Sequence, residues 1–172
     1  MSASPAPACA YTVRAAELRD VVAIVALIRE LAAFEQLGHL LQVTPEQLRP
    51  HLFGEKPVAE AIVADLGGEV VAFALFFTNF STFLAQPGLY LEDLYVKPAR
   101  RGIGIGIGCA LLTRLGRLAV ERGYGRFEWS VLDWNTDAIG FYEKMGATVM
   151  PDWRICRVTG SALKRLGAAA AS

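Results

Sequence analysis

The stretch from Leu89 to Leu112, which reads LYLEDLYVKPARRGIGIGIGCALL, constrains the fold more than any other part of the sequence. It starts as an apolar run typical of a β-strand, crosses a basic loop with glycine at alternate positions, and ends in apolar residues at helical spacing. Glycine lets a backbone approach a ligand closely and adopt φ > 0, and the free N–H groups at a helix start attract anions. Strand, glycine loop and helix in this order predict a site for a phosphate-like anion.

Length and composition limit both the fold and the partners. The chain has 172 residues, 53% of them apolar, which predicts a single domain over residues 11–172 behind a disordered tail over residues 1–10. Its 17 Lys and Arg balance 17 Asp and Glu, so no overall charge favours nucleic acid. We therefore expect phosphate recognition to be local, at the cluster of Lys97, Arg100 and Arg101.

No feature of the sequence indicates export or a membrane partner. The opening MSASPAPACA lacks the basic and apolar regions of a signal peptide, and the longest strongly apolar run, Val70 to Phe77, is too short to cross a bilayer. The three cysteines are widely spaced and show no metal-ligand pattern, so no metal is expected. These features predict a cytoplasmic protein.

Periodicity and turn signals predict the order β-α-α-β-β-β-α-β-α-β, which is one α/β domain. Residues 44–47 (TPEQ) form a good helix start, and residues 66–68 (LGG) a hairpin turn. The polar residues 79–88 are expected to form a loop. The expected strands cover residues 11–14, 59–64, 69–78, 89–96, 125–132 and 153–158, and the expected helices residues 16–36, 45–54, 109–122 and 135–145.

The glycine loop does not match the two best-known phosphate fingerprints. A P-loop ends in Gly-Lys-Ser/Thr, and the chain has no such tripeptide. The dinucleotide spacing G-x-G-x-x-G would need glycine at Ile107 or at Cys109. The motif present is instead Arg-x-x-Gly-x-Gly-like, RGIGIG over residues 101–106.

Together with LEDLYV before it, ALLTRL after it and WNTDAIGFYEKMGA further on, this loop resembles the acetyl-CoA-binding core of the GNAT superfamily of N-acetyltransferases. IRELAAFE and YLEDLYV also resemble the diamine (spermidine/spermine or thialysine) acetyltransferase subgroup, over about residues 11–158. The resemblance implies a mixed, mostly antiparallel sheet that splays between strands four and five and is flanked by helices. Acetyl-CoA would lie in the gap.

The resemblance also implies which residues bind the cofactor. Strand four would offer its backbone to the pantetheine, the loop would hold the pyrophosphate, and the asparagine after strand five would help to position the cofactor. An extra Ile-Gly pair relative to the family leaves Gly106 and Gly108 as competing candidates for the place next to the helix. The implied residues are Leu94, Tyr95, Val96, Arg101, Gly102, Ile103, Gly104, Ile105, Gly106, Gly108 and Asn135.

Two residues are candidates for the proton transfers that amide formation requires. Glu92 would help to deprotonate the amine, and Tyr142 would protonate the departing thiolate, as the corresponding tyrosine does in the family. The alternatives are a salt-bridged surface acid for Glu92 and a core residue for Tyr142, which shares a helix face with Phe141 and Met145. Strand alternation places Glu92 and its neighbour Asp93 on opposite faces.

The end of the first helix is the candidate substrate site. Glu35 matches an acid that binds the amine in the diamine subgroup, and Phe34 stands where that subgroup usually has tyrosine. A solvated helix-end charge is the alternative for Glu35. The loop that carries an aspartate in the polyamine enzymes has Ser81 or Thr82 here, so a shorter diamine or lysine-like amine fits better than spermine.

The sequence thus predicts an acetyl-CoA-dependent N-acetyltransferase acting on a small primary amine by direct attack in a ternary complex, without metal. A protein or peptide amine and an aminoglycoside are alternative acceptors, and a non-catalytic acetyl-CoA-binding module is an alternative of another class. The resemblance implies a homodimer, with subunit contacts in the tail from Trp153 to Leu166.

Overall fold

A five-stranded sheet organises the first of the two compact units into which the chain divides, one ending at Ser130 and the other beginning at Val131. The computed structural model describes residues 11–102 and 106–168. Ile103, Gly104 and Ile105 of the predicted cofactor loop lie outside these residues, as does the predicted tail over residues 1–10. A single domain over residues 11–172 stays a prediction.

The sheet is mixed and mostly antiparallel, as predicted. Neighbouring strands are antiparallel except β4 and β5, which run parallel. The predicted hairpin between β2 and β3 is confirmed, and Gly67 and Gly68 supply its turn at φ of 63° and 91°. In spatial order the strands are β1 (Thr12–Ala15), β2 (Glu60–Leu66), β3 (Glu69–Ser81), β4 (Gln86–Val96) and β5 (Arg126–Trp129).

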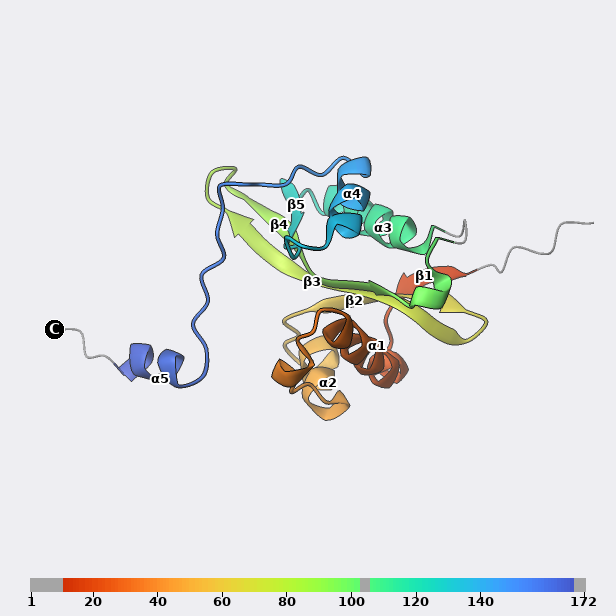
Figure 1. Ribbon diagram of the computed structural model, residues 1–172, viewed down its shortest axis with the longest axis horizontal. Helices are drawn as coiled ribbons and strands as arrows, with labels where there is room; N and C mark the ends of the chain where they lie inside the picture. The colour runs from red at the N-terminus through yellow and green to blue at the C-terminus, as the bar shows by residue number, and fades with distance from the viewer. Residues whose placement is uncertain (1–10, 103–105, 169–172) are drawn as a thin grey trace, which may run out of the picture. The chain divides into compact units, whose positions relative to one another are not determined.

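Helices cover both faces of this sheet (Figure 1). α1 (Val21–Phe34) and α2 (Pro45–Phe53) pack on one face, and α3 (Ile107–Glu121) packs on the other. The predicted start of α2 is confirmed, because the Gln47 backbone N–H donates to the Thr44 hydroxyl and the Gln47 side chain accepts from the Thr44 N–H. Short 3-10 turns cover Leu18–Asp20, Gly38–Leu40 and Pro98–Arg100.

Each face of the sheet has its own apolar core. Ile24 of α1 and Phe73 of β3 are fully buried in the core on the α1 face. On the other face Ile107, Leu111 and Leu115 recur every four residues along α3 and are buried as well. Since burial of one such side chain contributes about 1.5–3 kcal/mol, this stripe holds α3 and its N-terminus firmly against the sheet.

The prediction of a loop over residues 79–88 is wrong. β3 continues to Ser81, β4 begins at Gln86, and a turn over residues 82–85 joins them. Pro87 is tolerated because pairing with β5 starts only at Gly88, so β4 is an edge strand at Pro87 and can lack an N–H group there.

The final strand expected at Trp153 to Val158 is also wrong. Residues 153–159 have no regular secondary structure, and the described part of the second unit contains helices but no strand. An extended segment without a neighbouring strand cannot form the ladder of hydrogen bonds that defines a strand. The helices of this unit are α4 (Thr136–Lys144) and α5 (Gly160–Ala168), of which α5 was not among the expected helices.

Arg14 joins β1 to the start of α1 and to β2. Its guanidinium donates to both carboxylate oxygens of the buried Asp20, at 2.6 and 3.0 Å, and to Asp65 at 3.0 Å. These hydrogen bonds from Arg14 hold the pKa of Asp20 and of Asp65 below their usual value. The three residues thus connect the first strand to the rest of the unit.

Replacing Asp20 tests this connection. Asp20→Asn should lower the free energy of unfolding at pH 7 by about 2–3 kcal/mol, because hydrogen bonds between charged groups contribute about 1.5–3 kcal/mol. The lowered pKa means that the carboxylate stabilises the fold above pH ~4 and stops doing so as the pH falls through its folded value. Urea denaturation at several pH values measures both effects, with the exposed Glu55→Gln as control. A loss that stays the same in acid would contradict the ionic contribution.

Candidate active site

β4 extends beyond its pairing with β5. The two strands share four residue pairs, from Gly88–Arg126 to Leu91–Trp129. Beyond Leu91, the residues of β4 from Asp93 to Val96 pair only with β3. The sheet therefore opens at this point, as the resemblance implies, and the backbone groups of Leu94, Tyr95 and Val96 that face away from β3 form no ladder with β5.

A β-bulge in β4 places the two adjacent acids. Leu75 of β3 pairs with Asp93 and Phe76 pairs with Leu91, so Glu92 is the extra residue. Asp93 lies opposite Leu75, a core residue of the α1 face, so this side chain is on the α1 face too. Because the bulge interrupts the alternation at the exposed Glu92, strand alternation no longer fixes the two acids on opposite faces.

Three carboxylates share one electrostatic neighbourhood at this end of the sheet. Burial, followed by the negative charges of Glu92 and Glu35, raises the pKa of Asp93 to about 6. Burial also raises the pKa of Glu35, the C-cap of α1, where the helix dipole is negative. Within residues 11–102 and 106–168, no ion pair joins Glu35, Glu92 or Asp93 to a basic side chain. This acidic group, Glu35, Glu92 and Asp93, is suited to an incoming cation.

Arg101 leads from β4 into the glycine loop. Its Nε donates to the Val96 carbonyl oxygen at 2.7 Å, and its guanidinium carbon lies 5.0 Å from the ring centre of Tyr95 and 5.3 Å from that of Phe34. Of the residues implied for the pyrophosphate, Gly102 has φ of 67°, and a Cβ there would meet no heavy atom within 4 Å. The backbone at Gly102 is therefore open to a ligand.

Gly106, not Gly108, stands next to the helix. Gly106 is the N-cap of α3 with φ of 60°, a left-handed conformation that suits glycine, and it too has open space at its Cβ position. Gly108 lies in the first helical turn. The helix begins at Ile107, before the expected Cys109, because Ile107 starts the buried stripe of α3. The free N–H groups of that first turn are available to an anion.

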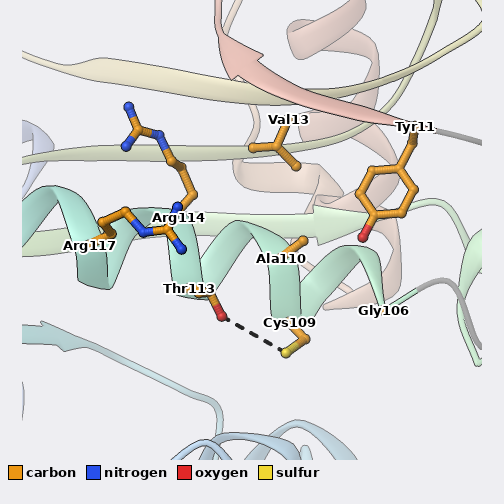
Figure 2. Close-up of a pocket in the computed structure, with 8 residues that line it drawn as sticks. All are labelled: Tyr11, Val13, Gly106, Cys109, Ala110, Thr113, Arg114 and Arg117. Atoms are coloured by element: carbon orange, nitrogen blue, oxygen red, sulfur yellow. Dashed lines mark hydrogen bonds between the residues drawn. The ribbon is translucent and has the colours of Figure 1, made fainter.

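A groove of about 530 Å³ runs along α3 from this N-cap (Figure 2). Figure 2 shows Arg114 and Arg117 on the helix, Val13 on the neighbouring strand β1, and Tyr11 just before that strand. The sequence did not predict the groove, because it depends on the packing of α3 beside β1. Its two arginines favour a negatively charged group.

Asn135 and Tyr142 belong to the second unit. The Asn135 side chain caps α4 by accepting a hydrogen bond from the Ala138 N–H at 3.3 Å. Tyr142 is half-buried and its ring centre lies 5.4 Å from that of Phe141. No residue of α4 is fully buried, so Tyr142 is not a core residue in the ordinary sense.

Besides the groove, two features of the site were not predicted from the sequence. The first is Asp93, because the sequence pattern points to Glu92 and only the bulge shows that strand alternation is interrupted here. The contact between Phe34 and Arg101 joins positions far apart in sequence, and no local signal predicts it.

A protein-family comparison agrees with the fold and with the resemblance. The model described as "Acetyltransferase (GNAT) family" matches residues 25–147. The chain belongs to the acetyltransferase (GNAT) family and is an N-acetyltransferase. Enzymes of this family use acetyl-CoA.

Its curated relatives include amine acetyltransferases. The chain is 36% identical to L-ornithine N5-acetyltransferase NATA1 of Arabidopsis thaliana, with 90% of this chain and 86% of the relative covered. It is 35% identical to thialysine N-epsilon-acetyltransferase of Mus musculus, with 90% and 95% covered. These relatives bear out the resemblance to the diamine subgroup.

Solved structures share the fold. An integron cassette protein from the V. cholerae mobile metagenome has a TM-score of 0.75 at 24% identity, over 91% of this chain and 97% of that chain. An aminoglycoside acetyltransferase from an uncultured soil metagenomic sample has a TM-score of 0.72 at 19% identity, over 87% and 95%. At these identities the likeness concerns the fold alone.

Two further properties concern the described part of the chain. None of its helices has the length and hydropathy needed to cross a bilayer. In the same ranges, no three His, Cys, Asp or Glu side chains are arranged to hold a metal ion.

Proposed function

We propose that this N-acetyltransferase moves the acetyl group of acetyl-CoA to a primary amine of a small diamine or lysine-like substrate, in a ternary complex. The acidic group of Glu35, Glu92 and Asp93 carries the proposal, because it combines burial with a lack of basic partners among the described residues. An alkylammonium ion would supply the missing positive charge. Ornithine and thialysine, named for two relatives, are amines of this kind.

Each acid has a proposed role. Asp93 and Glu35 hold the ammonium group, since they are the acids whose pKa burial raises. Glu92, exposed at the bulge, accepts the proton that the ammonium loses, through water. The neutral nitrogen then attacks the thioester carbonyl carbon, and the C–S bond breaks as the Tyr142 hydroxyl gives its proton to the departing sulfur. The proton that the nitrogen loses on becoming an amide returns, through water, to the Tyr142 oxygen.

Acetyl-CoA would be held by the part of β4 beyond its pairing with β5 and by the start of α3. The backbone of Leu94, Tyr95 and Val96 is the proposed partner of the pantetheine, because it extends beyond the pairing with β5. Arg101, Gly102, Gly106 and the first turn of α3 suit the pyrophosphate, since they offer a guanidinium, open backbone and free N–H groups. Asn135 is proposed to help position the donor.

Acceptor specificity tests the proposal. Thiol release with acetyl-CoA should give the highest kcat/KM with ornithine, thialysine or a short diamine, at least about 10-fold above spermine, an aminoglycoside and a lysine-containing peptide. A charge-assisted hydrogen bond of about 1.5–3 kcal/mol supports a difference of this size. A best acceptor that is a peptide or an aminoglycoside would overturn the acceptor assignment. Binding of coenzyme A without turnover of any amine would indicate a non-catalytic module.

Assembly as a homodimer stays a prediction from the resemblance. The segment predicted to make the subunit contact carries exposed apolar side chains, at Trp153, Ile155 and Leu166, which supports the prediction. A cytoplasmic location also stays a prediction.

A further inference from the structure

The Arg101 side chain is held in place before any ligand is considered. Its Nε donates to the Val96 carbonyl oxygen at 2.7 Å, which ties the guanidinium to the end of β4. The rings of Tyr95 and Phe34 lie 5.0 and 5.3 Å from the guanidinium carbon, both within the range of a cation–π contact. Arg101 thus has one polar and two aromatic supports.

The two aromatic supports differ in how firmly they are fixed. Tyr95 is buried in the sheet, and its hydroxyl donates to Glu30 of α1 at 3.1 Å. Phe34 is the last residue of α1, four residues after Glu30 and therefore on the same helix face. Its ring is 42% exposed, so burial in the core does not explain its place. The contact with Arg101 is a specific interaction of this exposed ring.

The arrangement leaves the two terminal amino groups of the Arg101 guanidinium available to a ligand. Among the residues that the structure describes, its two terminal amino groups donate to no backbone or side-chain acceptor. A guanidinium presents these groups as a fork that matches two phosphate oxygens. The Val96 carbonyl and the two rings therefore orient the guanidinium and do not occupy its terminal amino groups.

We propose that Phe34 is a positioning residue for Arg101 and sets the affinity for coenzyme A, instead of contacting the amine as the sequence predicts. The proposal rests on the proposed phosphate role of Arg101. Removing the ring frees the guanidinium to adopt other rotamers, and binding a phosphate then costs the entropy of ordering it again. Tyrosine at this position keeps the ring and should serve equally well.

Coenzyme A binding to the full-length protein, measured by isothermal titration calorimetry, tests the proposal without turnover. Phe34→Leu should raise the Kd for coenzyme A about 2- to 5-fold, as expected for loss of one exposed cation–π contact. Phe34→Tyr should leave it unchanged. Phe53→Leu is the matched control, because Phe53 ends α2 as Phe34 ends α1 and is 38% exposed. The KM for the amine should not change in any of these variants.

Arg101→Ala tests the phosphate role of Arg101 separately from the positioning role of Phe34. If Arg101→Ala leaves the Kd for coenzyme A unchanged, the phosphate role of Arg101 is wrong. If Arg101→Ala weakens binding and Phe34→Leu does not, the positioning role of Phe34 is wrong. In the double variant, Phe34→Leu should add nothing to the loss caused by Arg101→Ala. A raised amine KM with an unchanged Kd for coenzyme A would place Phe34 in the amine site.

Discussion

Tyr142→Phe should lower kcat by about 10²–10⁴-fold and leave the affinity for coenzyme A nearly unchanged. The substitution removes one oxygen atom, and with it the proton that we assign to the departing thiolate. Positioned general acids typically contribute rate factors of this size. The aromatic ring stays, so its contact with Phe141, at 5.4 Å between ring centres, is preserved.

The control for this prediction is a second tyrosine. Tyr124→Phe also removes one hydroxyl, which is hydrogen-bonded to Thr78 at 2.7 Å at the surface of the first unit. This variant should keep its kcat, so a change in Tyr142→Phe alone cannot come from the general loss of a hydroxyl. Steady-state kinetics on the best amine, with melting temperatures for all three proteins, provide the measurement. Full kcat in Tyr142→Phe would disprove the general-acid role.

Local signals predicted most of the scaffold because their physical causes are local. The Thr44 cap depends on residues within one helical turn, and the Gly67–Gly68 turn depends on two adjacent backbone conformations. The buried stripe on α3 follows from the helical repeat, even though the helix starts at Ile107 and not at Cys109. The opening of the sheet beyond Leu91 was available only through the family resemblance.

Three of the features that the sequence did not predict depend on pairing between strands. The bulge at Glu92 exists because β3 and β4 change register between Leu75 and Phe76, and no pattern within β4 alone reveals that change. Residues 79–88 are polar enough for a loop, but pairing between β3 and β4 makes them the end of a long hairpin. Residues 153–159 show the reverse case, since a segment that was expected to be a strand forms none without a neighbouring strand.

Asp93→Asn should make the protein more stable and less active. The pKa of Asp93 rises from 3.8 to about 6 in the folded state, first through burial and then through Glu92 and Glu35. Between pH 3.8 and 6 the folded state binds the proton more tightly than the unfolded state does, so the free energy of unfolding falls as the pH rises. Above pH 6 the ionised carboxylate lowers it by up to roughly 3 kcal/mol. A neutral amide avoids this cost. Asp93→Asn should therefore gain about 1–3 kcal/mol at pH 8 and little at pH 4 in urea denaturation.

The activity of the same variant should change in the opposite direction. An amide holds an ammonium group less tightly than a carboxylate does, so kcat/KM at pH 8 should fall on the order of 100-fold. In the unmodified protein kcat/KM should decline as the pH falls through about 6, far below the pKa of ~10.4 of an alkyl amine, and this inflection should be absent from Asp93→Asn. Glu55→Gln, an exposed acid outside the site, is the control for both measurements.

The two measurements on Asp93→Asn separate a functional acid from a structural one. If an acid serves to stabilise the fold, its replacement lowers both the stability and the activity of the protein. If an acid serves function instead, its charge is compensated only when the substrate binds, so it destabilises the free folded protein. Its replacement then raises the stability. A destabilised Asp93→Asn would mean that the carboxylate has a structural role. A stabilised and fully active variant would mean that Asp93 is not used, and that Glu35 and Glu92 alone hold the amine.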